Sequence, residues 1–127
     1  MSDTPPFNLR PARLADAECI FALIRQHPDE LVPKPMGDIV AIIDRFVVAE
    51  VEGEIVGCAT YSILPEIGTA ERATVELQSV AVSAAHRRLG IGRALVERPL
   101  RGQDTYGQGL VFHILTAWPA QAGPRPS

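Results

Sequence analysis

The sequence has few cysteines, few aromatic residues and no long apolar run. Its two cysteines, Cys19 and Cys58, are isolated in a chain of 127 residues, so we expect free thiols that pack as small buried hydrophobes in a reducing compartment. No run approaches the roughly 18 apolar residues of a membrane span, and the first residues lack the pattern of a signal peptide. These absences disfavour disulfide-rich, membrane and secreted proteins, and we expect a cytoplasmic protein.

An excess of charge of one sign is also lacking. The net charge is −3, which argues against nucleic acid as a bulk partner. The three histidines lie far apart, without the spacing of metal ligands, and none forms a persuasive pair with a cysteine or serine. We therefore expect neither a metal site nor an enzyme nucleophile. A hydrophobic fraction of 46% in 127 residues suits one domain with a core of its own.

The most informative stretch covers residues 74–98. It begins with β-branched and apolar residues that predict a strand ending near Ser83. A basic loop follows, and then apolar residues spaced i, i+3, i+4 predict a helix. The first N–H groups of a helix have no intrahelical partner and carry partial positive charge, and glycine lets a ligand approach the backbone closely. This order of strand, basic loop and helix start therefore predicts a binding site for phosphate or pyrophosphate.

The loop does not match two common phosphate-binding motifs. No Gly-Lys-Ser/Thr follows it, as in a P-loop, and Leu95 stands where a dinucleotide-binding fingerprint needs a third small residue. It does fit the pattern R-x-x-G-x-G, from Arg87 to Gly92, directly after a strand. In this it resembles the acetyl-CoA pyrophosphate loop of the GCN5-related N-acetyltransferase (GNAT) family. The alternative is a basic turn between an ordinary strand and an ordinary helix.

The order of the expected elements agrees with this resemblance. The order β-α-α-β-β-β-α is not a chain of βαβ units, so it disfavours a doubly wound fold. We expect a strand over residues 7–12, a helix after Asp16, a helix from the cap Asp38 through Asp44, strands over 45–50 and 55–62 joined by a hairpin turn, a connection over 64–72, the strand and helix of the motif, and a fifth strand over 110–115. For a GNAT protein this implies an α/β (α+β) fold, with a mixed central sheet flanked by helices.

The resemblance also implies a chemistry. GNAT proteins transfer acetyl from acetyl-CoA directly to an amine, without an enzyme nucleophile. By resemblance, backbone groups of Val80, Ala81 and Val82 pair with the pantetheine arm, and the N–H of Val80 polarises the thioester carbonyl. The pyrophosphate is then held by the loop and helix start, which consist of Arg87, Arg88, Leu89, Gly90, Ile91, Gly92 and Arg93.

Glu76 is the candidate for the general base. It lies eleven residues before Arg87, which is the spacing of the general-base glutamate in histone-acetylating relatives. Strand alternation places it on one face with Gln78, Val80 and Val82, among the residues expected to line the cofactor. The alternative is a surface glutamate on a half-exposed strand.

Several segments look like short stand-alone N-acetylglutamate synthases of arginine biosynthesis. These segments are residues 30–34, 38–40, 44–46 and 76–82. An acidic amino-acid substrate needs a cation for each carboxylate, and Lys34 is the candidate, with Arg10 and Arg45 as alternatives. Surface charge is the ordinary role of all three. A tyrosine is often the general acid in the family, but Tyr61 and Tyr106 are not at the expected place, so both are expected to pack.

The end of the chain departs from the family pattern. Residues 99–127 hold three charged residues, four prolines and four glycines, so we expect the last helix and final hairpin of the family to be absent. We expect a single domain over residues 1–117, a disordered tail over 118–127, and self-association as a homodimer through an exposed strand edge. Three functions stay open: N-acetylation of an amino acid such as L-glutamate, N-acetylation of another small amine, and non-catalytic acyl-CoA binding. No nucleic-acid or membrane partner is expected.

Overall fold

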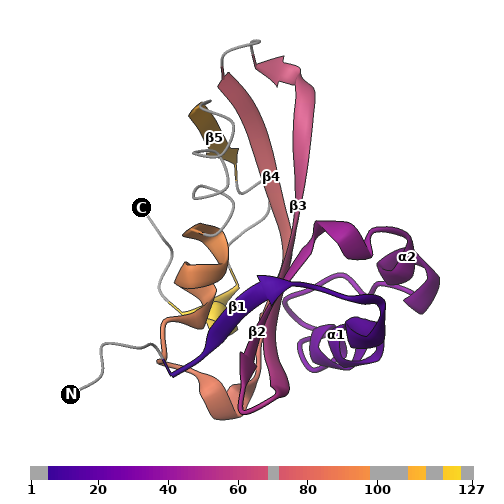
Figure 1. The fold of residues 1–127 in the computed structure, drawn as a ribbon, viewed down its shortest axis with the longest axis vertical. Helices are drawn as coiled ribbons and strands as arrows, with labels where there is room; N and C mark the ends of the chain where they lie inside the picture. Colours follow the sequence, from indigo (N-terminus) through magenta and orange to yellow (C-terminus); the bar gives the residue numbers. More distant parts are fainter. Residues whose placement is uncertain (1–5, 69–71, 98–108, 114–118, 124–127) are drawn as a thin grey trace.

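A mixed sheet of five strands forms the centre of the protein (Figure 1). The computed structural model describes residues 6–68, 72–97, 109–113 and 119–123. The strands, adjacent in chain order, are β1 (Asn8–Pro11), β2 (Phe46–Val51), β3 (Glu54–Gly68), β4 (Arg72–Val82) and β5 (Gly109–His113). Neighbours from β1 to β4 are antiparallel, and β5 is parallel to β4. This sheet has helices on both faces, which confirms the expected α/β fold.

β3 and β4 form a longer hairpin than the sequence predicted. We expected a connection over residues 64–72, but β3 continues to Gly68 and β4 begins at Arg72. Backbone pairing, for example of Leu64 with Thr74, extends through the expected connection. Pairing between two adjacent antiparallel strands outweighs local propensity here.

The turn between β2 and β3 lies where the sequence predicted it. Glu52 and Gly53 form this two-residue turn, with φ values of 50° and 83°. Positive φ at both central residues matches the right-handed twist of the flanking strands. The prediction of a hairpin at this position is therefore confirmed.

Two helices cover one face of the sheet. α1 (Ala17–Arg25) follows η1 (Leu14–Asp16) and buries Ile20, Leu23 and Ile24, as the apolar spacing predicted. Its first turn begins directly after Asp16. The remaining side of α1 is exposed, so the helix has one apolar face directed to the core.

α2 (Met36–Ala41) begins and ends earlier than expected. We expected Asp38 to cap a helix through Asp44, but Pro35 is the N-cap, and the N–H of Asp38 already donates to the Pro35 carbonyl at 3.0 Å. Asp38 therefore lies in the first turn, where a carboxylate interacts favourably with the helix dipole. The chain then continues as η2 (Ile43–Arg45).

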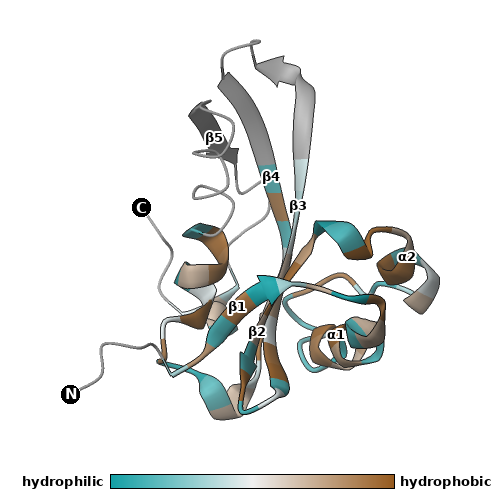
Figure 2. Ribbon diagram, in the orientation of Figure 1, coloured by the Kyte–Doolittle hydropathy of each residue, from teal (hydrophilic) through white to brown (hydrophobic). Residues whose placement is uncertain are grey.

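The sheet carries a hydrophobic cluster on each face. On the α1/α2 face the buried residues are Ala17, Ile20, Leu23, Ile24, Ile39, Phe46, Val48, Cys58 and Ala81. On the opposite face, which is covered by a helix over 91–97 and by η4 (Ala120–Ala122), they are Val47, Ala49, Val56, Ala59, Val80, Val82, Ile91, Leu95 and Ala122. Apolar and polar stretches alternate along α1 and α2 in Figure 2, which is typical of helices with one buried face.

The two cysteines are free but lie in different environments. Cys58 is fully buried, and burial raises the pKa of its thiol to about 12. Cys19 is exposed on α1, so the expectation of a buried thiol was wrong there, because this residue falls outside the apolar stripe of the helix. In the described ranges no helix is both long and apolar enough to span a membrane.

Candidate functional site

A bulge interrupts β4 in the middle of the predicted cofactor strand. Cys58 of β3 pairs with Ala81 and Thr60 pairs with Gln78, so a step of two residues on β3 matches a step of three on β4. Ser79 lies within the bulge and has a φ of 54°, a left-handed conformation that is uncommon for serine. Because side chains alternate along a strand, one extra residue reverses the face to which the side chains beyond it point.

The bulge overturns the expected alternation of β4. Glu76 and Gln78 lie on the α1/α2 face with their partners on β3, one of which, Thr60, donates its hydroxyl to a carbonyl of η2 at 3.4 Å. Val80 and Val82 belong instead to the cluster on the opposite face. The prediction that Glu76 shares a face with these two valines was therefore wrong.

The loop after β4 has a backbone that a ligand can approach. It follows η3 (Ala84–His86), and Arg88 and Gly90 have φ values of 69° and 81°. A Cβ at Gly90 would meet nothing within 4 Å, so the space beside it is open. Arg87 and Arg88 are exposed, and neither forms an ion pair with another residue in the described part of the chain. Their charge is available to an anion.

The other loop and helix-start residues have distinct environments. Leu89 is exposed, whereas Ile91 is buried in the cluster of the opposite face. Arg93 forms an exposed ion pair of 3.0 Å with Glu97, one helical turn further on. Because this pair partly neutralises Arg93, the free positive charge of the site is concentrated in the loop before Gly90.

The end of the chain packs closely on the helix over 91–97. Gly92 is buried, and a Cβ there would lie 2.0 Å from the carbonyl oxygen of Ala122, so no larger residue fits without movement. We expected residues 118–127 to be disordered with little to bury. Residues 119–123 instead form η4 with flanking residues, and Pro119, Gln121 and Ala122 are buried. Small apolar side chains beside a glycine supply the contact that we had not expected.

The side chain of Gln121 binds the backbone of β4. Its Oε1 accepts a hydrogen bond from the N–H of Val82 at 2.7 Å, and its Nε2 donates to the carbonyl of Val80 at 2.7 Å. Gln121 is only 2% exposed. These two backbone groups are the ones predicted to pair with the pantetheine arm. A glutamine in a proline-rich end carried no sequence signal for this contact.

His27 also contacts this strand and was missed. Its Nε2 lies 3.0 Å from the carbonyl oxygen of Val82, and the contact is buried. Because a carbonyl only accepts, the ring donates from Nε2. His27 follows the last turn of α1, so it fixes the end of β4 to the α1/α2 face. A single histidine after a helix gave no reason to expect this role.

The predicted base and two of the predicted acceptor cations lie on the α1/α2 side. Glu76 is half-buried and accepts a hydrogen bond from the side chain of Gln78. Lys34 lies in the connection between α1 and α2 and is half-buried, and no polar partner is found for it among the described residues. Arg45 is exposed in η2. The fold therefore places all three on one side of the sheet.

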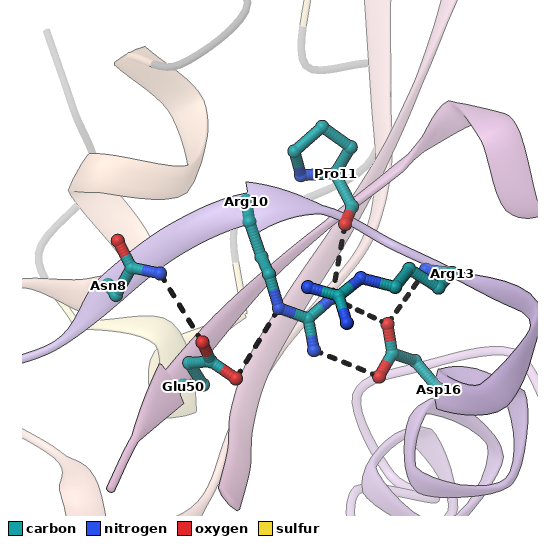
Figure 3. Close-up of polar contacts among 6 residues, drawn as sticks. All are labelled: Asn8, Arg10, Pro11, Arg13, Asp16 and Glu50. Atoms are coloured by element: carbon teal, nitrogen blue, oxygen red, sulfur yellow. Dashed lines mark hydrogen bonds and ion pairs between the residues drawn. The ribbon is translucent and has the colours of Figure 1, made fainter. Parts of the chain in front are cut away.

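Arg10 is engaged in a structural network (Figure 3). Its Nη1 and Nη2 donate to the two carboxylate oxygens of Asp16 at 2.7 and 3.0 Å, and its Nε lies 3.4 Å from Glu50. The hydrogen bond from Arg10 lowers the pKa of Asp16 and raises the pKa of Arg10 itself. Asp16 also accepts from the N–H of Arg13 at 2.7 Å. Arg10 thus joins β1, β2 and η1, and it has little capacity left for a substrate.

The remaining candidates do not add to the site. Tyr61 packs against the cluster of the opposite face, as expected for a packing tyrosine, and Tyr106 lies outside the described residues. Among the residues that the structure places, no three His, Cys, Asp or Glu side chains are grouped so that they could hold a metal ion.

Known proteins resemble this chain in sequence. A profile described as the acetyltransferase (GNAT) family matches residues 15–101. The uncharacterized N-acetyltransferase CT2212 of Chlorobaculum tepidum is 34% identical over 110 residues, which make up 85% of this chain and 66% of the relative.

Solved structures share the fold. Rv2747 from Mycobacterium tuberculosis, in complex with CoA and NLQ, has a TM-score of 0.66 and 28% identity, over 77% of this chain and 58% of that chain. N-acetylglutamate synthase from Neisseria gonorrhoeae, complexed with CoA and N-acetyl-glutamate, has a TM-score of 0.69 and 25% identity, over 80% and 23%. Diaminobutyrate acetyltransferase EctA from Paenibacillus lautus, in complex with its substrate and CoA, has a TM-score of 0.60 and 28% identity, over 73% and 55%.

These similarities agree on the family and differ in substrate. N-acetylglutamate synthase is one of several similar acetyltransferases, so the sequence resemblance to that enzyme does not single it out. The chain spans less than two thirds of the length of each of these four proteins. The family profile nevertheless covers well over half of the chain, including α1, the bulged strand and the loop. This chain belongs to the acetyltransferase (GNAT) family.

Proposed function

We propose that the protein is an acetyl-CoA-dependent N-acetyltransferase that transfers acetyl directly to the amine of a small substrate. The observation that carries the proposal is the succession of the bulged β4, an open basic loop and a helix start, in a chain of this family. Three similar solved structures contain CoA, which supports acetyl-CoA as the co-substrate.

The donor site uses the edge of β4 and the loop. The pyrophosphate binds the backbone N–H groups between Arg87 and Gly92, and the exposed Arg87 and Arg88 balance its charge. Leu89, Ile91 and Arg93 complete this loop and helix start. The pantetheine arm pairs with the carbonyl of Val80 and the N–H of Val82, on either side of Ala81, which are the groups that now bind Gln121.

The catalytic groups lie on both sides of β4. Glu76 removes the proton from the ammonium substrate, directly or through a water, and the N–H of Val80 polarises the thioester carbonyl. The amine then attacks, the C–S bond breaks as the amide forms, and the CoA thiolate takes up a proton. Glu76 is on the α1/α2 face and Val80 on the opposite face. The N–H of Val80 is a backbone group in the plane of the sheet, so the face of the Val80 side chain does not restrict access of the thioester to it.

We propose an amino acid such as L-glutamate as the acceptor. Lys34 is the cation for a substrate carboxylate, and its place beside α1 and α2 puts it on the side of Glu76. The exposed Arg45 is a second cation on that side, whereas Arg10 is held by Asp16. The similarity to N-acetylglutamate synthase supports this acceptor, and the similarity to diaminobutyrate acetyltransferase supports the alternative of another small amine.

Further features of the whole protein are proposals too. We propose one cytoplasmic domain, with the boundary moved from residue 117 to include the packed residues 119–123. We propose a homodimer that needs no metal and binds neither nucleic acid nor membrane. The departure of the chain from the family pattern after residue 98 stays a prediction.

A matched pair of variants at Gly90 tests the donor site. Gly90→Asp adds a negative charge where the pyrophosphate is proposed to bind, and Gly90→Asn has nearly the same size without the charge. Both residues tolerate a positive φ better than other non-glycine residues. Because like charges repel over a few ångströms, we expect calorimetry to show acetyl-CoA affinity about tenfold or more weaker for the Asp variant than for the Asn variant. Equal affinity in two folded variants would contradict the anion loop.

A substrate panel then separates the functions. Steady-state CoA release is measured with L-glutamate, other amino acids and simple amines. Release with L-glutamate alone supports the proposed acceptor, and release with a different amine supports the alternative. Acetyl-CoA binding without release for any acceptor would mean a non-catalytic binding module.

A further inference from the structure

We propose that the segment 119–123 is an autoinhibitory element that occupies the pantetheine position of β4. The inference rests on the proposed function, because the groups that the segment binds are those assigned to acetyl-CoA. It goes beyond that function, because the end of the chain then controls access of the co-substrate to its site.

The hydrogen bonds of Gln121 are those that an extra strand would make. A residue of a parallel neighbouring strand donates to one carbonyl and accepts from the N–H two residues on. Gln121 does this with Val80 and Val82, both at 2.7 Å. Its carboxamide also carries the same donor and acceptor as the amide groups of a pantetheine arm. The N–H of Val82 has one hydrogen to donate, so Gln121 and the arm cannot both bind it and exclude each other at this position.

Packing at Gly92 holds the segment in the same place. The position of a Cβ at Gly92 lies 2.0 Å from the Ala122 carbonyl oxygen and 3.1 Å from the Ala122 Cβ. Ala122 is buried with Ile91 and Leu95. Gly92, the last glycine of the R-x-x-G-x-G pattern, is therefore in contact with Ala122 of the segment 119–123.

A third contact lies outside the proposed cofactor site. The N–H of Ala120 donates to the carboxylate of Glu30 at 2.9 Å, and Glu30 lies in the exposed turn after α1. The segment is thus fixed at β4, at the helix over 91–97 and at Glu30. When the open form is only a fraction of the population, the apparent dissociation constant of acetyl-CoA is raised by the inverse of that fraction.

Substitutions that release the segment test the proposal. Gln121→Ala removes both hydrogen bonds to β4, and Glu30→Ala removes the third contact without altering any group assigned to acetyl-CoA. Gln26→Ala is the control, because Gln26 is exposed at the end of α1. Calorimetric titration with acetyl-CoA should give an affinity about tenfold higher for Gln121→Ala and about threefold higher for Glu30→Ala, since each lost hydrogen bond favours opening by a factor of several. The control should match the wild-type protein.

Hydrogen exchange of the wild-type protein gives a second measurement that needs no variant. The amides of Ala122 and Gly123 are bonded within the segment, and that of Ala120 is bonded to Glu30. Acetyl-CoA should increase exchange of the peptide that covers 119–123, because binding displaces it. A merely structural segment would keep its protection when acetyl-CoA binds.

The outcomes separate this inference from the proposed function. Higher affinity in either folded variant, with increased exchange over 119–123 on binding, supports autoinhibition. Measurable binding with equal or lower affinity in both variants, and an unchanged segment, overturns the inference and leaves the proposed function in place. If Gln121→Ala fails to fold, Glu30→Ala and the exchange experiment decide. Absence of acetyl-CoA binding in every folded protein overturns the proposed function and this inference with it.

Discussion

Gly57→Ala should weaken both the fold and the proposed anion site, although Gly57 is not in the loop. Gly57 lies on β3 opposite Val82, and a Cβ there would be 2.7 Å from Cγ2 of Ile91. Ile91 is the first residue of the helix over 91–97 and is 2% exposed. Ile91 Cγ2 is attached directly to Cβ and is buried, so it is not the flexible end of a side chain that could move aside easily. The helix start itself must move.

The magnitude follows from two opposing terms. Overpacking a filled core costs about 1–3 kcal/mol. Replacing a strand glycine by alanine recovers about 0.5–1 kcal/mol of backbone entropy. The difference between these ranges runs from about 0 to about 2.5 kcal/mol, so we expect Gly57→Ala to lower the free energy of unfolding by about 1 kcal/mol. A shift of the helix start should also weaken acetyl-CoA binding, because the loop amides before Ile91 move with it.

Urea unfolding followed by circular dichroism measures the stability, and calorimetry measures the affinity for acetyl-CoA. Gly37→Ala is the matched control, because a Cβ at this exposed position of α2 meets nothing within 4 Å. It should raise the free energy of unfolding by about 0.5–1 kcal/mol. Ile91→Leu removes Cγ2, so the double variant with Gly57→Ala should recover stability relative to Gly57→Ala alone. A Gly57→Ala protein as stable as wild type, with unchanged affinity, would refute the reasoning.

Two further predictions concern Glu76 and Asp16. Glu76→Gln should lower turnover about 10²–10⁴-fold, as expected for loss of a general base. It should leave acetyl-CoA affinity nearly unchanged, because the groups proposed to bind acetyl-CoA are backbone groups of Val80 and Val82 and the loop after β4. An unchanged pH–rate profile in the variant would place the base elsewhere. The hydrogen bond from Arg10 lowers the pKa of Asp16 in the folded protein. The stabilisation from this carboxylate is therefore complete above the pKa of Asp16 in the unfolded chain, about 4, and is lost as the pH falls through the lower pKa of the folded state. Asp16→Asn should therefore be less stable than wild type in urea at pH 7, with a difference that shrinks toward pH 2–3; a difference independent of pH would contradict the role assigned to this pair.

The parts that sequence predicted well depend on local pattern. The apolar spacing after Asp16 located α1, and Glu52 and Gly53 located the hairpin turn. Arg87 to Gly92 indicated the loop because glycine marks positions of positive φ, and Gly90 has one. Each of these features is decided by residues within one or two turns of chain.

The features that the sequence did not predict are backbone conformations unusual for their residue type and contacts between residues far apart in the chain. Ser79 has positive φ, but serine gives no indication of it, so the bulge and the true faces of Glu76 and Val80 could not be read from the sequence. The hydrogen bond between Val82 and Gln121 joins residues 39 positions apart. No residue near Gln121 in the sequence predicts that contact. Its partner is the backbone N–H of Val82, which a side chain can reach because the described pairing of β4 with β5 ends at Glu76.

The bulge at Ser79 also lets the two halves of β4 change independently. Substitutions at positions 76 and 78 reach the side covered by α1 and α2, and those at 80 and 82 reach the other side. A lineage could therefore alter the side proposed for the amine without disturbing the side proposed to lie near acetyl-CoA. If β4 were a regular strand with the same residues and no bulge, plain alternation would put Glu76 on the side of Val80, four positions further on. The bulged conformation thus separates two selective pressures that in a regular strand would act on the same face.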